Sequence, residues 1–446
     1  MSLSRLTLCT LVVLSLLVPS AGATWSIVVV DTATGEVAVG TATCLEGTDL
    51  RAFVPVIAVG YGAGATQSQV DTTGNHKKII YNGLRNGVTP NGILIQLAQG
   101  DLLKCSRQFG VVDMNTQTAS KTGNCAGPFA DHINGSMGTL TWAIQGNVIT
   151  GPEVLQDAET ALLTTPGRLS DKLMAAMEAA RARGGDGRCS CLTGTPPSCG
   201  APPAAGFEKS AHVGTVVLAR IGDPDGTCFG GAIGCANGDY WMSLNFRGVA
   251  EDIDPVFFLQ AQYDNFLERL RGHPDGLESR GFWRDPTPLP GGTLLELDVD
   301  LRDLDGLPAS GDYRVRVDHA PGSAGRAQRY DVQDHGDGTY TVRILAPSGT
   351  GTDAFAVRVD GGPRPATLYP YPSFDYDAQL QTSGGDGAAA GVSRMDEVVA
   401  VWRGGRSLDG PPAQGPARAS QDAARAARAE SVRRATPPSR ASALRR

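Results

Sequence analysis

Thr24 is the residue of this sequence best equipped for chemistry, because it would become the first residue once a leader is removed. Residues 1–23 have the form of a secretory signal peptide, with a basic start at Arg5, an apolar run, and small residues at Ala21 and Ala23. Cleavage after Ala23 leaves Thr24 with a free α-amine beside its own hydroxyl. A nucleophile and a weak base on one residue can attack an amide or ester carbonyl. The simpler interpretation is that every signal peptide must end somewhere and that threonine is common.

Such a site needs a base, a group that stabilises the oxyanion, and groups that hold the substrate. The free amine has an unperturbed pKa of about 8, so it can act as the base at neutral pH. We predict Asn147, at a change from strand to loop, as the oxyanion donor; capping of a turn is the alternative. Asp186 and Arg188 stand between glycines and are predicted to pair across the cleft, or else to anchor the segment that follows. Gln67 and Ser210 are the predicted substrate contacts, with a structural role as the alternative for Gln67.

Composition excludes several classes of protein. The chain has 446 residues, which suggests two or three domains, and its formal net charge is only −7. The first three hundred residues lack a basic stripe, which argues against nucleic-acid binding. After the leader no segment is apolar and long enough to cross a bilayer, and no Walker loop or H-E-x-x-H zinc helix occurs. We therefore expect a secreted or otherwise extracytoplasmic protein with no cofactor and no metal, acting on a small molecule or peptide; a homo-oligomer is left open.

The cysteines predict disulfides. Nine are present, and Cys9 in the leader leaves eight in the exported chain. An even number in a secreted protein is typical of a disulfide set, although spacing alone does not give the pairing. A metal site at residues 189–199 is the alternative, but no histidine stands at a suitable spacing. The candidates are Cys44, Cys105, Cys125, Cys189, Cys191, Cys199, Cys228 and Cys235.

The elements that would position these residues follow a repeated order. Strands are predicted over residues 25–30, 36–43, 54–67, 108–114 with a continuation at 116–121, 139–148, 213–221 and 240–246. Helices are predicted over 76–86, 90–97, 153–163, 169–183 and 256–270, two of them opened by Thr89-Pro90 and Asp254-Pro255. Pairs of strands that alternate with pairs of helices predict buried sheets covered by helices on both outer sides.

The composition changes along the chain predict five regions. After the signal peptide, residues 24–272 form the first domain, with a Cys- and Pro-rich insertion over 187–207. A stiff Pro-rich linker follows over 273–292. Short strands separated by Asp-Gly turns predict a small immunoglobulin-like β-sandwich over 293–372. The Arg- and Ala-rich tail, 373–446, shows no burial pattern and is predicted to be mostly disordered.

Several separate motifs, in the right order, carry a resemblance to a known family. They lie at residues 24–31 (TWSIVVVD), 60–67 (GYGAGATQ), 107–113 (RQFGVVD), 145–151 (QGNVITG) and 184–188 (GGDGR), with Lys209-Ser210-Ala211 after the insertion. From about residue 24 to 272 the sequence resembles the domain-of-unknown-function 1028 family. That family resembles the N-terminal-nucleophile (Ntn) hydrolases, so the resemblance implies an α+β fold, a four-layer αββα sandwich with Thr24 as nucleophile.

Two departures from the family pattern bear on activity. Many relatives carry a lysine, and others a cysteine, near the end of the second strand, where this chain has Thr43-Cys44. In threonine peptidases of the superfamily a lysine near this place lowers the basicity of the terminal amine. The insertion also breaks a family stretch and leaves Arg188 and Lys209-Ser210 at its two ends.

The sequence thus predicts a secreted hydrolase that cleaves an amide or ester bond through Thr24. The alternative is an exported binding or structural protein that keeps the hydrolase fold without activity. In either case the β-sandwich is expected to contact a cell wall or glycans.

Overall fold

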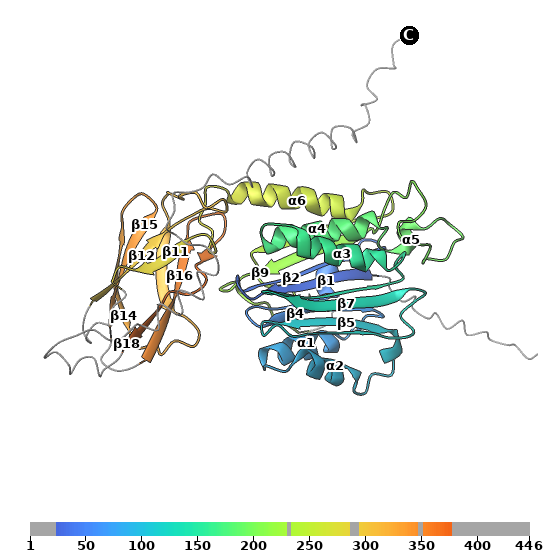
Figure 1. Cartoon of the computed structure of the whole chain (residues 1–446), viewed down its shortest axis with the longest axis horizontal. Helices are drawn as coiled ribbons and strands as arrows, with labels where there is room; N and C mark the ends of the chain where they lie inside the picture. The colour runs from blue at the N-terminus through green and yellow to red at the C-terminus, as the bar shows by residue number, and fades with distance from the viewer. Residues whose placement is uncertain (1–23, 230–232, 286–293, 347–350, 377–446) are drawn as a thin grey trace, which may run out of the picture. The chain divides into compact units, whose positions relative to one another are not determined.

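The computed structural model describes residues 24–229, 233–285, 294–346 and 351–376 (Figure 1). The predicted signal peptide and most of the predicted tail lie outside the described residues. Within them, none of the helices is both long enough and apolar enough to cross a bilayer.

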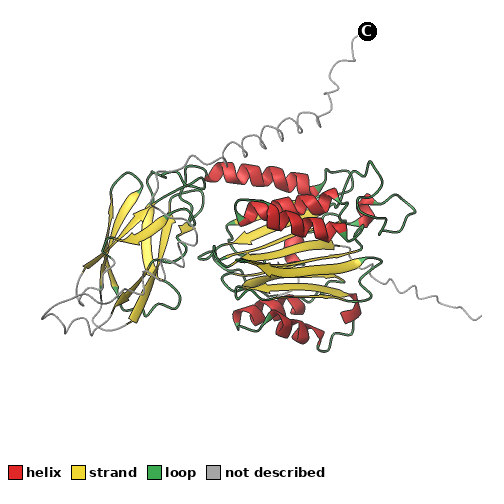
Figure 2. Ribbon diagram, viewed as in Figure 1, coloured by secondary structure: helices red, strands yellow, loops and turns green. Residues whose placement is uncertain are grey.

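Two antiparallel sheets form the centre of the first region (Figure 2). The larger sheet has the strand order β10-β9-β2-β1-β8-β7, and the smaller has the order β3-β4-β5-β6. The strands of the larger sheet are β1 (Thr24–Asp31), β2 (Glu36–Thr43), β7 (Ala130–Met137), β8 (Leu140–Asn147), β9 (Val213–Ala219) and β10 (Met242–Arg247). Those of the smaller sheet are β3 (Pro55–Ala58), β4 (Gly62–Ser68), β5 (Arg107–Asp113) and β6 (Thr118–Thr122).

Helices cover the outer face of each sheet (Figure 1). The larger sheet is covered by α3 (Glu153–Thr164), α4 (Leu169–Ala182) and α6 (Pro255–Leu270), and the smaller by α1 (Asn75–Arg85) and α2 (Pro90–Ala98). Short helices η1 (Leu50–Ala52), η2 (Lys104–Ser106) and α5 (Gly187–Ser190) lie in connections. The two predicted helix starts are confirmed: Thr89 Oγ1 accepts the Gly92 amide at 3.2 Å, and Asp254 Oδ1 accepts the Val256 amide at 2.9 Å.

Three apolar layers hold these elements together. Ile27 and Val29 of β1 face helices α3, α4 and α6, whereas Val28 and Val30 face the smaller sheet. A third layer lies between the smaller sheet and helices α1 and α2 and includes Ile80. Since both faces of β1 are buried, its run of consecutive apolar residues is what such a strand requires.

The sequence prediction differs from the structure at three places in this region. The strand predicted over 108–114 and its continuation over 116–121 are two antiparallel partners, β5 and β6. The single strand predicted over 54–67 is a hairpin of β3 and β4, because Gly60 turns the chain with φ of 76°. Strand β7 was not predicted; it is the polar, largely exposed edge of its sheet and lacks the alternation that marks a half-buried strand.

The later described residues form two further antiparallel sheets. One has the order β11-β12-β15-β14; in the other β16 pairs with β13, β17 and β18. The strands are β11 (Arg280–Trp283), β12 (Leu294–Asp300), β13 (Arg314–His319), β14 (Gln328–Asp334), β15 (Thr339–Leu345), β16 (Gly351–Asp360), β17 (Ala366–Thr367) and β18 (Ser373–Tyr376). Trp283 joins the two sheets through edge contacts with Phe355 and Phe374, at centroid distances of 5.7 and 5.2 Å.

These strands extend past the predicted limits of the sandwich. Strand β11 lies inside the predicted linker 273–292, and β18 lies inside the predicted tail 373–446. Each has only four residues, too few for alternation to be read beside Pro- and Gly-rich neighbours.

The disulfide prediction is correct for six of the eight cysteines. The bonded pairs are Cys44–Cys189, Cys191–Cys199 and Cys228–Cys235. Within the described residues Cys105 and Cys125 are unbonded, contrary to the prediction. They are nonetheless neighbours, since the Cys125 amide donates to the Cys105 carbonyl at 2.6 Å. An even count of cysteines therefore did not oblige every one to pair.

Candidate functional site

Thr24 begins β1 and is held through both of its main-chain polar groups. Its nitrogen donates to Asn147 Oδ1 at 3.2 Å, and its carbonyl accepts from Gln67 Nε2 at 2.7 Å. Asn147 is the strand partner of Thr24 at the end of β8, and Gln67 belongs to β4 of the facing sheet. In the uncleaved chain Thr24 is 3% exposed and Asn147 is fully buried. Two sheets thus meet at the residue that the sequence predicts as the nucleophile.

Asn147 is fixed by its position and by a second contact. Its Nδ2 donates to the Ala126 carbonyl at 3.2 Å, while Oδ1 faces Thr24. Val148 follows with φ of 52°, a left-handed conformation that is rare for a β-branched residue and that ends the strand. The amide oxygen of Asn147 is therefore an acceptor for the main-chain nitrogen of Thr24.

Asp186 and Arg188 form one compact pair on the segment after α4. Arg188 approaches Asp186 with Nε at 3.1 Å and Nη2 at 2.8 Å, and its own amide donates to Asp186 at 3.0 Å. The Cys44 amide is a further donor, at 2.7 Å. These donors compensate the burial of a carboxylate that has no exposed surface. The pair lies within one short turn rather than spanning two walls.

The same pair reaches the end of β2, beside the start of β1. Arg188 Nη2 donates to Thr43 Oγ1 at 3.2 Å, and Trp25 pairs with Ala42, so the next step of the register brings Thr43 alongside Thr24. The Cys44–Cys189 disulfide fixes the residues that follow Thr43 and Arg188. Arg188 is consequently a cation held at the end of β2, beside the start of β1.

His212 lies close to that disulfide without making it a metal site. A ring nitrogen of His212 and the sulfurs of Cys44 and Cys189 lie within 4.8 Å of one another. The two sulfurs are bonded to each other, so neither is a thiolate ligand. Burial lowers the pKa of His212, and nearby Lys209 acts in the same direction.

Gln67 and Ser210, the predicted substrate contacts, are both interior residues. Gln67 is 1% exposed and binds the Thr24 carbonyl. Ser210 is fully buried, and its amide and hydroxyl donate to Asp254 Oδ2 at 2.7 and 2.8 Å. Asp254 caps helix α6, so Ser210 ties the end of the insertion to that helix.

The six predicted site residues nevertheless form one connected region. Asp186 donates its amide to the Ser210 carbonyl at 2.9 Å, and the Gly187 amide donates to the Val148 carbonyl at 3.0 Å, next to Asn147. Three further residues were missed by the sequence reasoning, namely Ser26, Gln108 and Gln145, which surround Gln67. A signal was present, because polar side chains inside otherwise apolar buried strands require partners.

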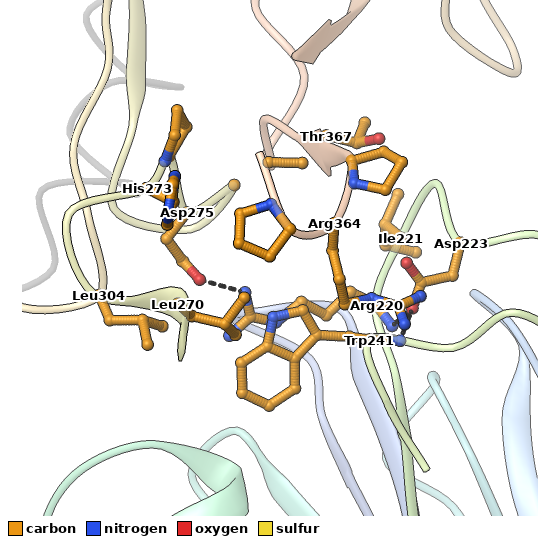
Figure 3. A pocket seen from close by; sticks show the side chains of 15 residues that line it. Arg220, Ile221, Asp223, Trp241, Leu270, His273, Asp275, Leu304, Arg364 and Thr367 are labelled. Carbon is orange, nitrogen blue, oxygen red and sulfur yellow. Dashed lines mark hydrogen bonds and ion pairs between the residues drawn. The ribbon is translucent and has the colours of Figure 1, made fainter. Parts of the chain in front are cut away.

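A pocket elsewhere in the chain is lined by charged groups that already have partners (Figure 3). Arg220 binds Glu36 at 2.8 Å and Asp275 at 2.6 Å and stacks on Trp241, with the guanidinium carbon 3.8 Å from the ring centroid. Burial lowers the pKa of Arg220, but the carboxylates of Asp275 and Glu36 outweigh it and raise the pKa overall. The six predicted site residues all lie outside its lining.

A comparison with family models finds a match for the region around Thr24. Residues 24–191 match the model of a family of unknown function (DUF1028). Among solved structures, protein SPO2555 from Silicibacter pomeroyi, described with the family model DUF1028, is 16% identical, with 55% of this chain and 88% of that chain covered and a TM-score of 0.39. The Lin-41 filamin domain is 17% identical, with 24% of this chain and 97% of that chain covered and a TM-score of 0.18. No curated protein matches. The segment that carries Thr24, Asn147, Asp186 and Arg188 is thus the part of the chain that matches the DUF1028 family.

Proposed function

We propose that this protein is an exported hydrolase of the N-terminal-nucleophile type, in which Thr24 attacks an amide or ester carbonyl. One observation carries the proposal. The nitrogen of Thr24, which leader cleavage would convert into an amine, donates to the buried Asn147 side chain, while Gln67 holds the carbonyl of the same residue. A first residue anchored on both sides is what a terminal nucleophile requires.

In the proposed reaction the Thr24 hydroxyl adds to the substrate carbonyl and its proton passes to the α-amine, directly or through a water. The leaving amine or alcohol departs with that proton, which leaves an ester on Thr24 Oγ. Water then adds to this ester, the α-amine again takes and returns the proton, and the acid product leaves. We assign Asn147 to the amine rather than to the oxyanion, because the atom that faces the nitrogen is an acceptor.

Arg188 is the proposed electrostatic partner of the amine. Its guanidinium contacts Thr43 at the strand end beside Thr24, and a nearby positive charge disfavours protonation of an amine. Arg188 would thereby perform the task that the resemblance gives to a lysine in threonine peptidases. The buried carboxylate of Asp186 holds the guanidinium in place.

The runner-up is an exported binding or structural protein that keeps the four-layer αββα Ntn-like arrangement and contacts cell walls or glycans through its immunoglobulin-like sandwich. One observation favours it: where many relatives carry a lysine, this chain has Cys44 in a disulfide.

The test starts from the chain as exported. Its first residue, read by terminal sequencing and intact mass, is expected to be Thr24. The mature protein would be assayed on broad amide and ester panels and with a β-lactone probe that acylates threonine hydroxyls. Thr24→Ala, and a chain with one alanine added before Thr24, should both lose activity and labelling, whereas Thr24→Ser should retain part. Equal behaviour of all these chains would reject the enzyme and favour the binding protein.

A further inference from the structure

Four polar side chains lie in a group between the two sheets of the first region. Ser26 and Gln145 are strand partners in the larger sheet, and Gln67 and Gln108 are strand partners in the smaller. Each is at most 1% exposed. We call this group the amide cluster. Its surroundings are apolar, since the same inner layer is built from residues such as Val28 and Ala65.

The hydrogen bonds of the amide cluster run in one direction. Gln108 Nε2 donates to the Thr122 hydroxyl at 2.9 Å and to the carbonyls of Asp131 and Gly146 at 3.0 and 2.9 Å. These acceptors fix the Gln108 amide, so its oxygen turns toward Gln67 and accepts from Gln67 Nε2 at 2.7 Å. Gln67 Oε1 accepts from Ser26 Oγ at 2.5 Å.

This direction leaves Gln67 Nε2 aimed at Thr24. Besides Gln108, the nitrogen donates to the Thr24 carbonyl at 2.7 Å and lies 3.3 Å from the Gln145 carbonyl. Rotating the Gln67 amide by half a turn would set its oxygen against other acceptors, so only one orientation satisfies the cluster. The cluster therefore provides a donor of fixed direction at the Thr24 carbonyl.

Burial of these amides needs an explanation, because moving an amide out of water costs free energy unless the protein supplies hydrogen-bond partners. The cluster is not perfectly satisfied. Within the described residues Gln145 Oε1 lacks a hydrogen-bond partner, and it lies close to Gly110 of the facing sheet. Apolar side chains would fill the same layer without such a group. Stability alone does not account for three glutamines beside Thr24.

We propose that Gln67 is a positioning residue for Thr24, and that Gln108 sets the direction of the Gln67 amide. This inference rests on the proposed function of Thr24. With the nitrogen bound to Asn147 and the carbonyl to Gln67, the α-carbon of Thr24 is held from both sides. The hydroxyl can then take only the few staggered rotamers of one fixed backbone, which limits its directions of attack before substrate binds.

The test uses Gln67→Glu in the mature full chain, because this substitution keeps the side-chain shape. A protonated carboxyl can still donate to the Thr24 carbonyl, whereas a carboxylate repels it. Relative to wild type at the same pH, labelling of Thr24 by the β-lactone probe, located by peptide mass, should fall about 10- to 100-fold where the introduced carboxyl is ionised, and this difference should close toward acid pH. A role only in stability would not produce this pH-dependent recovery in a variant that stays folded throughout.

The backbone contact can be followed without activity. Trp follows Thr only at Thr24-Trp25 and Thr141-Trp142, so labelling threonine carbonyl carbons with ¹³C and tryptophan nitrogens with ¹⁵N gives two NMR signals. In Gln67→Glu the Thr24 signal should move with pH beyond the shift that titration of the α-amine produces in wild type, and the Thr141 signal should stay in place.

Thr215→Val is the matched control. Thr215 is also a buried polar residue of the larger sheet, and its hydroxyl donates to the Leu244 carbonyl at 2.6 Å, away from the amide cluster. In the Thr215→Val variant the probe should label Thr24 at the wild-type rate. If Gln67→Glu labels within about twofold of wild type over the pH range, the positioning role is overturned while Thr24 stays the nucleophile. A wild-type chain that never labels at Thr24 would instead overturn the nucleophile, and the positioning role with it.

Discussion

Arg220 offers the sharpest stability prediction, because its charge is buried between two buried carboxylates. The side chain of Arg220 is 8% exposed, and those of Glu36 and Asp275 are 1% and 4% exposed. Removing one partner of such a group leaves an uncompensated charge in the interior, which costs about 3–5 kcal/mol. Arg220→Met removes the charge but keeps an apolar chain over Trp241. We therefore expect the free energy of unfolding to fall by that amount.

The comparison that isolates charge from packing is a triple variant. Glu36→Gln and Asp275→Asn added to Arg220→Met remove all three charges while preserving the shapes of the acid side chains. The triple variant should be more stable than Arg220→Met alone, because no buried charge remains without a partner. The variant with three substitutions would then have a larger free energy of unfolding than the variant with one.

The assay is urea denaturation followed by far-ultraviolet circular dichroism and tryptophan fluorescence. Arg51→Met is the matched control: Arg51 binds Asp49 at 2.7 Å, but their side chains are 37% and 26% exposed. This surface pair should contribute at most about 1 kcal/mol. The reasoning is refuted if Arg220→Met costs no more than Arg51→Met, or if the triple variant is less stable than the single one.

Three further predictions concern other parts of the first region. Reducing the Cys44–Cys189 disulfide, or replacing both cysteines by serine, should slow labelling of Thr24 by the probe even at temperatures where calorimetry shows that the protein is still folded. Burial lowers the pKa of His76, so its stabilising contribution is complete above about pH 6.5 and is lost as the pH falls; His76→Gln should flatten the fall of unfolding free energy between roughly pH 7.5 and 5.5. Gly110→Ala should cost about 1–3 kcal/mol in urea denaturation, because a Cβ there would lie 2.0 Å from Gln145 Oε1, and an unchanged midpoint would contradict the packing argument.

The local elements were predictable because their causes are local. The runs of Val and Ile in β1, the Thr89-Pro90 and Asp254-Pro255 helix starts, and the helices that follow depend on residues a few positions apart. The failures were edge strands and the hairpin turn at Gly60. In β7 and β11 the side chains are mostly exposed or half-buried, so little burial pattern is imposed on the sequence.

The candidate site was predictable as residue types but not as contacts. The leader pattern and Thr24 are matters of sequence, as is the presence of Asn147, Asp186 and Arg188. Their roles depend on which strands adjoin: Asn147 meets Thr24 across 123 positions and Gln67 meets it across 43. The sequence alone suggested that Asn147 would donate to an oxyanion, whereas the structure turns its acceptor atom toward Thr24.

The amino-acid order by itself indicated most of the strands and helices, and it singled out Thr24 as the residue that would carry both an amine and a hydroxyl if a leader were removed after Ala23. Only tertiary structure decided which cysteines bond, since Cys44 meets Cys189 across 145 positions while the neighbouring Cys105 and Cys125 stay unbonded. It also decided that Gln67 faces Thr24. The physical reason is that periodicity and capping act over one or two turns, whereas disulfides and buried hydrogen bonds depend on the distance and direction of groups brought together by sheet pairing and packing.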